Sequence, residues 1–279
     1  MLKTERMDRV RAALRAQGLT QMIVCDPKSV WYLTGVAVEP YERLLALYLP
    51  TEGEPVLFLN RLFNVPEPPC RTVWHTDTDK PVAQIAEVVD AGRPLGIDKE
   101  WPAKFLIPLM ETHPGMQVVL SSDCVDDCRA CKDAEEQTLM REASRINDAV
   151  NEAAKHYIKA GMTEREVAEF IDAQFRAHGC EGPSFTTIVS FGANAADPHH
   201  EPDDTVLKEG DCVLFDMGCV KSRYCSDMTR TWFCGQPTEK QAAVHDLVRR
   251  ANEAAEALIK PGVRLCELDA AARLSLIHI

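Results

Sequence analysis

The feature that most constrains the fold of this chain is a change of pattern near residue 133. Up to about residue 122, short helical and strand patterns alternate, which is typical of an α/β domain. From Asp133 a long amphipathic helical pattern begins, and β-rich sequence follows. A chain of 279 residues is long enough for two cores. We therefore predict an α/β domain at residues 1–122, a linker at 123–132 and an α+β domain at 133–279.

Local patterns specify elements of the first part. Apolar residues recur at helical spacing over residues 4–17, and a short buried strand is expected at 22–25. Asp26-Pro27 predicts a turn. The apolar runs 44–49 and 56–59 are separated by a polar turn, which predicts a β-hairpin.

The second part begins with two predicted helices. The first ends at Gly161, and Thr163 with Glu166 three positions later forms a capping-box pattern for the next. A β-rich stretch is expected from about 185 to 234, followed by a helix after Thr238.

Composition narrows the class of partner. The formal net charge is −12, so the field of the protein repels phosphates, and we expect neither nucleic acid nor membrane as a partner. The charged N-terminus has no apolar core of the signal-peptide kind, and no apolar run is long enough to span a bilayer. Eleven scattered cysteines indicate reduced thiols. We expect a cytoplasmic protein.

Three of these cysteines are closely spaced. Cys124, Cys128 and Cys131 form a CxxxCxxC pattern, which is compatible with an iron-sulfur cluster or part of a zinc site. No fourth ligand is evident, and ordinary thiols are the simpler interpretation.

Two aspartates stand beside predicted strands in the segment 211–233. Asp216 follows the buried run Val213–Phe215, and Asp227 precedes the strand Thr229–Phe233. A hairpin turn centred on Lys221 and Ser222 would place Asp216 directly opposite Asp227.

Directly opposed carboxylates, with Cβ atoms about 5 Å apart, destabilise a sheet unless something compensates their charge. Two divalent cations about 4 Å apart would do so, and oxygen ligands suit manganese. The alternative is that each aspartate caps a turn or pairs with Arg223 or Arg230.

A histidine pair lies upstream in the loop Phe191–Pro202. An imidazole near a metal centre can bind a substrate carbonyl or assist proton transfer, so His199 and His200 are candidates. The alternative is a surface loop with solvated histidines.

In their order and their residues, several segments together resemble the pita-bread metallopeptidases, specifically the aminopeptidase P and prolidase branch. The first part also looks like the creatinase-type N-terminal domain of that family through the segment 26–35. The matching segments of the second part are Ser190–Pro202, Lys208–Asp211, Phe215–Gly218, Tyr224–Thr231 and Lys260–Gly262.

The resemblance implies a small α/β domain followed by a pita-bread α+β domain. It implies that Asp216 and Asp227 are metal ligands and that His199 contacts the substrate at the scissile bond. Two divalent ions are implied, with manganese expected and cobalt or zinc as alternatives. In the family, a metal-bridging hydroxide attacks a peptide bond involving proline, the substrate is a proline-containing peptide, and the full-length protein is a homodimer.

Two other functions stay open. A creatinase-like or ectoine-hydrolase-like amidinohydrolase or amidase would share the fold, as would a metal-free binding module. Aminopeptidase and dipeptidase activity are both compatible with these residues.

The family pattern also includes one further His and two Glu ligands, whereas only 52 residues follow Asp227. His245, Glu253, Glu256 and Glu267 are expected on helix faces. The segment Leu274–Ile279 matches nothing in the family. We therefore expect a pita-bread domain that is incomplete at the C-terminus, an inactive fragment, and exposed core in the second domain.

Overall fold

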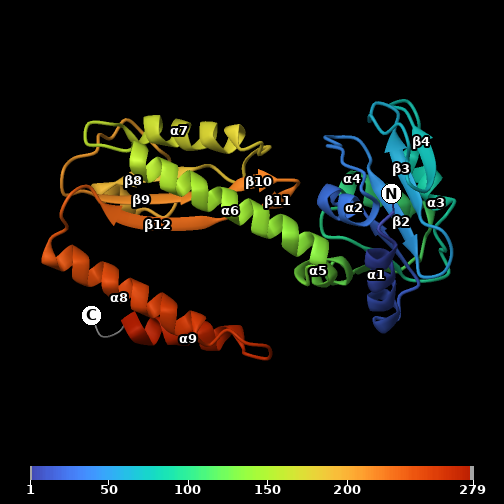
Figure 1. Ribbon diagram of the computed structural model, residues 1–279. Helices are drawn as coiled ribbons and strands as arrows, with labels where there is room; N and C mark the ends of the chain where they lie inside the picture. Colours follow the sequence, from blue (N-terminus) through green and yellow to red (C-terminus); the bar gives the residue numbers. More distant parts are fainter. Residues whose placement is uncertain (1, 277–279) are drawn as a thin grey trace. The chain divides into compact units, whose positions relative to one another are not determined.

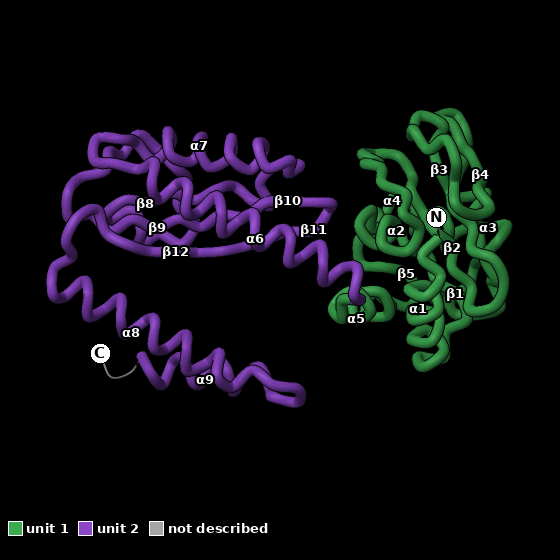
Figure 2. The backbone as a smooth tube through the Cα atoms, viewed as in Figure 1, with its two compact units in different colours: residues 1–132 green, residues 133–279 purple. Residues whose placement is uncertain are grey.

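The computed structural model describes residues 2–276, which form two compact units (Figures 1 and 2). Unit 1 comprises Met1–Lys132 and unit 2 Asp133–Ile279. Among the described residues, no helix combines the length and apolar character needed to cross a bilayer.

Unit 1 is built on a six-stranded sheet in the order β4-β3-β2-β1-β5-β6. The central strands β1, β2 and β3 pair antiparallel, whereas β4, β5 and β6 each pair parallel with a neighbour. The expected hairpin is β2–β3. The strands are β1 (Gln21–Val24), β2 (Ala46–Pro50), β3 (Val56–Asn60), β4 (Arg71–His75), β5 (Leu95–Ile97) and β6 (Val118–Leu120).

Helices cover both faces of this sheet. Met22 and Val24 pack in one core with α1, α2 and α5, while Ile23 between them packs in a second core with α3 and α4. Alternate residues of a strand point to opposite faces, so a strand buried on both sides is apolar throughout. The helices are α1 (Thr4–Ala16), α2 (Pro27–Thr34), α3 (Pro81–Ala86), α4 (Ala103–Thr112) and α5 (Asp123–Ala130).

Two expectations for unit 1 are wrong. Asp26-Pro27 is the start of α2 rather than a turn: the Asp26 carboxylate accepts the N–H groups of Lys28 and Ser29, and Pro27 takes the first helical position. Residues 123–130, predicted as part of a linker, form α5, and its Cys124, Val125 and Cys128 belong to the core.

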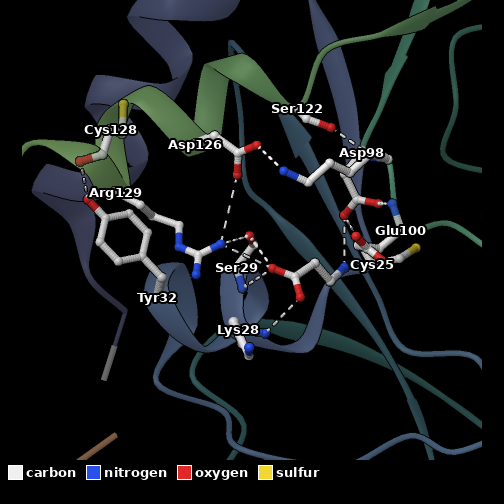
Figure 3. Close-up of polar contacts among 12 residues, drawn as sticks. Cys25, Lys28, Ser29, Tyr32, Asp98, Glu100, Ser122, Asp126, Cys128 and Arg129 are labelled. Atoms are coloured by element: carbon white, nitrogen blue, oxygen red, sulfur yellow. Dashed lines mark hydrogen bonds and ion pairs between the residues drawn. The ribbon is translucent and has the colours of Figure 1, made fainter. Parts of the chain in front are cut away.

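A buried carboxylate ties the strand ends of unit 1 together (Figure 3). Asp98, at the end of β5, is 5% exposed. It accepts the backbone N–H groups of Cys25, Asp26 and Glu100. Burial raises the pKa of Asp98, and these hydrogen bonds oppose that rise. Arg129 of α5 donates to Asp26 and Ser29, which fixes α5 to the start of α2.

Unit 2 begins with two capped helices, α6 (Ala134–Tyr157) and α7 (Glu164–Ala177). Each has a reciprocal capping box, Asp133 with Glu136 and Thr163 with Glu166, and the second of these was expected from the sequence. Two further helices, α8 (Glu239–Glu256) and α9 (Leu265–Leu276), close the described chain and pack against each other.

Two three-stranded sheets complete unit 2, in the orders β12-β9-β8 and β11-β10-β7. The first packs one face against α6 and α7 around Phe175, Phe191 and Phe215 (Figure 1). The strands are β7 (Gly182–Pro183), β8 (Ile188–Phe191), β9 (Cys212–Met217), β10 (Cys219–Lys221), β11 (Tyr224–Cys225) and β12 (Met228–Phe233), with a 3₁₀ helix η1 (Gly192–Ala196) after β8.

Candidate metal centre and histidine loop

The two candidate ligands lie on one hairpin, residues 212–233, here called the ligand hairpin. Its turn is formed by Ser222 and Arg223, which both have positive φ, of 50° and 67°. The predicted centre at Lys221 and Ser222 is therefore wrong, and Asp216 pairs with Thr229 rather than with Asp227. Two consecutive residues with positive φ are the geometry of a type I′ turn, which matches the twist of paired strands.

The corrected register still keeps the two carboxylates near each other. Asp227 lies two positions before Thr229, the partner of Asp216, in the short stretch that joins β11 to β12. Diagonal neighbours in a sheet are about 7–8 Å apart at the backbone. The two aspartates therefore avoid the direct opposition that was predicted.

Gly218 makes the crossing between the two aspartates possible. A Cβ atom at this position would lie 2.0 Å from the carbonyl oxygen of Ser226 and 2.3 Å from the hydroxyl of Ser184. Here the chain passes from β9 into β10 and so from one sheet into the other. Only glycine allows this approach.

Asp216 has an unsatisfied oxygen. Its Oδ1 atom is buried and has no hydrogen-bond partner among residues 2–276. A buried carboxylate oxygen without a partner is costly, because it has lost its water and gained nothing in return. A bound divalent cation would supply the missing interaction, so this residue fits a metal centre.

Asp227 is exposed and lines a pocket of about 440 Å³. The pocket is polar: α6, β12 and α8 all contribute to it, but Asp216 and His199 do not. Asn147 is 1% exposed, and its amide group donates to the Met217 carbonyl next to Asp216. The remaining lining residues are Ser144, Asp148, Met228, Thr229, Arg230 and Asn252.

His199 and His200 lie in the segment 191–203, here called the histidine loop. His199 is exposed, and its backbone N–H donates to the Asp197 carboxylate at 2.9 Å. His200 turns inward, where its Nε2 lies 2.6 Å from Oε2 of Glu164. The two histidines therefore have different surroundings: His199 is exposed, whereas His200 is hydrogen-bonded to a buried carboxylate.

Within residues 2–276, one group of three metal-ligating side chains comes together: Glu164, His200 and Asp203. Glu164 is fully buried, and each of its carboxylate oxygens already accepts from two nitrogen donors. Four donors saturate a carboxylate and leave no lone pair for a cation. We therefore interpret this group as a hydrogen-bonded cluster rather than as a metal centre.

Sequence reasoning missed Glu164. The capping-box pattern of Thr163 and Glu166 predicted the start of α7 but no role for Glu164. In the structure, Glu164 is the residue of this helix start that contacts the histidine loop. Its partners are 27 to 39 positions away along the chain, so no local pattern could reveal them.

The other candidate ligands named from the sequence make ordinary core or surface contacts. Cys124 and Cys128 are core residues of unit 1, and burial raises the pKa of the Cys124 thiol to about 11, while Cys131 is exposed. His245, on the face of α8, donates from Nε2 to the Thr231 carbonyl. Glu253 and Glu267 form exposed ion pairs with arginines of their own helices or helix starts.

Known proteins match along nearly the whole chain. The model of metallopeptidase family M24 matches residues 138–278, so the match extends into the segment 274–279, contrary to expectation. The model of the creatinase/prolidase N-terminal domain matches residues 6–131. An uncharacterized peptidase from Staphylococcus aureus is 34% identical over 261 residues, which cover 90% of this chain and 72% of the relative.

Two solved structures have the same fold over all or nearly all of the chain. A prolidase from Thermococcus sibiricus has a TM-score of 0.91 and 29% identity, covering 100% of this chain and 78% of its own. The dipeptidase PepE from Mycobacterium ulcerans has a TM-score of 0.90 and 31% identity, covering 99% and 76%. The predicted creatinase-type and pita-bread domains are confirmed, and this chain belongs to metallopeptidase family M24.

Proposed function

We propose that this protein is a metal-dependent peptidase that hydrolyses peptide bonds involving proline. The observation that carries the proposal is the buried, unpartnered Oδ1 of Asp216 on the same hairpin as Asp227. Relatives named prolidase and dipeptidase support the substrate class.

Asp216 and Asp227 are the residues that would hold the metal, each through carboxylate oxygen. Hard oxygen ligands suit manganese, which is the proposed ion, with cobalt or zinc as alternatives. Bound divalent ions would supply an activated water and polarise the peptide carbonyl. A pair of ions, rather than one, is part of the proposal.

His199 is proposed to contact the substrate at the scissile bond. Its side chain is exposed, while the turn around Asp197 fixes its backbone. An imidazole placed in this way can donate to a carbonyl oxygen or move a proton on the leaving amine.

Manganese binding tests the metal centre without any need for turnover. We expect the protein to bind Mn²⁺ in a paramagnetic-resonance titration, and Asp216→Asn to abolish that binding. Asp204→Asn is the matched control, because Asp204 is exposed and pairs only with the exposed Arg165 in the described contacts. Equal Mn²⁺ binding by all three proteins would refute the centre.

The substrate class is tested with matched peptides. Alanyl-proline, alanyl-alanine and the tripeptide alanyl-prolyl-alanine separate a proline dipeptidase, a general dipeptidase and an aminopeptidase. Cleavage of alanyl-alanine as fast as alanyl-proline would contradict the proline preference. The predicted inactivity of the 279-residue chain stays a prediction, which the same assay tests. The homodimer and the cytoplasmic location also stay predictions.

A further inference from the structure

Glu164 lies beneath the histidine loop and contacts it at four places. Oε1 accepts the backbone N–H of Phe191 at 2.7 Å and the side-chain amide of Asn194 at 3.0 Å. Oε2 lies 2.6 Å from His200 Nε2 and accepts the backbone N–H of Asp203 at 3.2 Å. The contacts thus run from the first residue of the loop to the last.

The surroundings of Glu164 make these contacts strong. Its side chain is 0% exposed, and that of His200 is 14% exposed. Hydrogen bonds to a buried carboxylate are charge-assisted and not weakened by water. Glu164 is also the first residue of α7, so its position is set by the capping box at Thr163.

The backbone around Glu164 adds to the constraint. Its N–H donates to the Thr205 carbonyl, and the next residue, Arg165, donates to the Asp203 carbonyl. Thr163 forms an isolated bridge with Val206. The far end of the histidine loop is thereby held against the start of α7, and the carboxylate holds the rest.

We propose that Glu164 is a positioning residue that, with His200, fixes the histidine loop so that the adjacent His199 is presented to the substrate. The set of contacts among Glu164, Phe191, Asn194, His200 and Asp203 is here called the Glu164 clasp. The link to catalysis rests on the proposed role of His199, whereas the clasp itself does not.

The first test is amide hydrogen exchange over residues 191–203, followed by mass spectrometry. Glu164→Gln keeps the size of the side chain but loses its charge and half of its acceptor capacity. We expect loop amides to exchange at least tenfold faster in Glu164→Gln, while β9 and β12 keep their protection. Unchanged loop exchange would overturn the clasp, and so would an equal rise across the whole of unit 2.

A matched pair at His200 separates hydrogen bonding from packing. His200→Gln can still donate an N–H toward Glu164, whereas His200→Leu fills similar space without a donor. We expect His200→Leu to reproduce the faster loop exchange and His200→Gln to restore most of the protection. Asp204→Asn, in the next residue after the loop, is expected to leave exchange unchanged. Equal effects of the two His200 variants would contradict the proposal.

The last test connects the clasp to His199. Diethyl pyrocarbonate modification of His199 is expected to change several-fold in rate in Glu164→Gln but not in Asp204→Asn. If the peptide-hydrolysis assay gives turnover, against the predicted inactivity of the chain, Glu164→Gln is expected to lower kcat/KM about tenfold in the parent and to have no further effect in His199→Ala. Additive losses would overturn the positioning role. A fully active His199→Ala would instead refute the proposed role of His199 and leave the clasp, judged by exchange, in place.

Discussion

Asp98 in unit 1 and Asp216 in unit 2 are both carboxylates at or near the end of a β-strand, yet their surroundings are opposite. Asp98 accepts three backbone N–H groups from two neighbouring segments. Asp216 has one buried oxygen, Oδ1, that accepts no hydrogen bond from the residues that the structure describes. The hydrogen bonds of Asp98 join neighbouring segments of unit 1, whereas Oδ1 of Asp216 is left without a hydrogen bond in the described part of the chain.

This difference distinguishes Asp98, a structural acid, from Asp216, the proposed metal ligand. A buried polar atom in a folded protein is normally paired, so an exception requires an explanation. The carboxylate of Glu164 resembles that of Asp98, because its oxygens are paired and accept from four donors. Clustering of acids and histidines alone would have selected Glu164 as the metal ligand; the count of donors selects Asp216.

The largest predicted effect concerns Mn²⁺ and Asp216. Binding only to the folded state at about 1,000 times the dissociation constant raises the free energy of unfolding by about 4 kcal/mol. We expect the parent protein to show such a rise in urea unfolding and Asp216→Asn to lose most of it. Asp98→Asn is the matched control and should keep the response to Mn²⁺. If both variants lost the stabilisation by Mn²⁺, the proposed difference between Asp98 and Asp216 would be wrong.

The next effect concerns Asp98 without metal. Asp98→Ala leaves three backbone N–H groups without their acceptor and should lower the free energy of unfolding of unit 1 by about 3 kcal/mol. Urea unfolding followed by the fluorescence of Trp31, Trp74 and Trp101 measures it. Asp127→Ala, at an exposed position of α5, should change stability by less than about 0.5 kcal/mol. If Asp98→Ala left the free energy of unfolding unchanged, the hydrogen bonds at Asp98 would contribute little to stability.

Gly218→Ala should act on the ligand hairpin with a smaller cost. The added methyl group would meet the Ser226 carbonyl, so the strands must separate, at about 2 kcal/mol. Mn²⁺ affinity should fall together with stability, because the shift separates Asp216 from Asp227. Gly92→Ala, where the new methyl group meets only the Asp90 side chain at 3.2 Å, is the control. Full Mn²⁺ affinity in Gly218→Ala would mean that the hairpin does not set the ligand spacing.

The smallest predicted effect is a gain in the stability of the ligand hairpin. Arg223 has φ of 67°, which costs a non-glycine residue about 1 kcal/mol, so Arg223→Gly should stabilise the turn by about that amount. Thermal unfolding of unit 2 is the measurement. Lys221→Gly, one strand position before the turn, should instead destabilise it. Stabilisation by both glycines would indicate a different turn register.

The sequence predicted the hairpin but not its register. The runs 213–215 and 229–233 are strands as predicted, and Asp227 directly precedes the second one, whereas Asp216 lies inside β9 rather than after it. The turn residues Ser222 and Arg223 are not the Asn-Gly type that marks a type I′ turn, so nothing local fixed its centre. The pairing was decided by strands β10 and β11, which are too short to show a pattern.

In unit 1, the helix start at Asp26 was visible but was interpreted as a turn. Asp followed by Pro fits an N-cap and first helical position as well as it fits a turn, and the choice depends on packing of Val30 and Leu33 into the core. Strand β4 was not predicted, because Arg71–His75 mixes polar and apolar residues at a sheet edge. The Glu164 contacts, which span 27 or more positions, could come only from the fold.

The hydrogen bonds of Asp98 and Arg129 join residues that all lie between positions 25 and 129. Chains are synthesised from the N-terminus at about 5–20 residues per second, and domains generally fold as units in that order. Every partner in this network is therefore made before the codons for Asp216 and Asp227 are read. On the ribosome, unit 1 can reach its final hydrogen-bonded state before Asp216, the proposed metal ligand, has been synthesised.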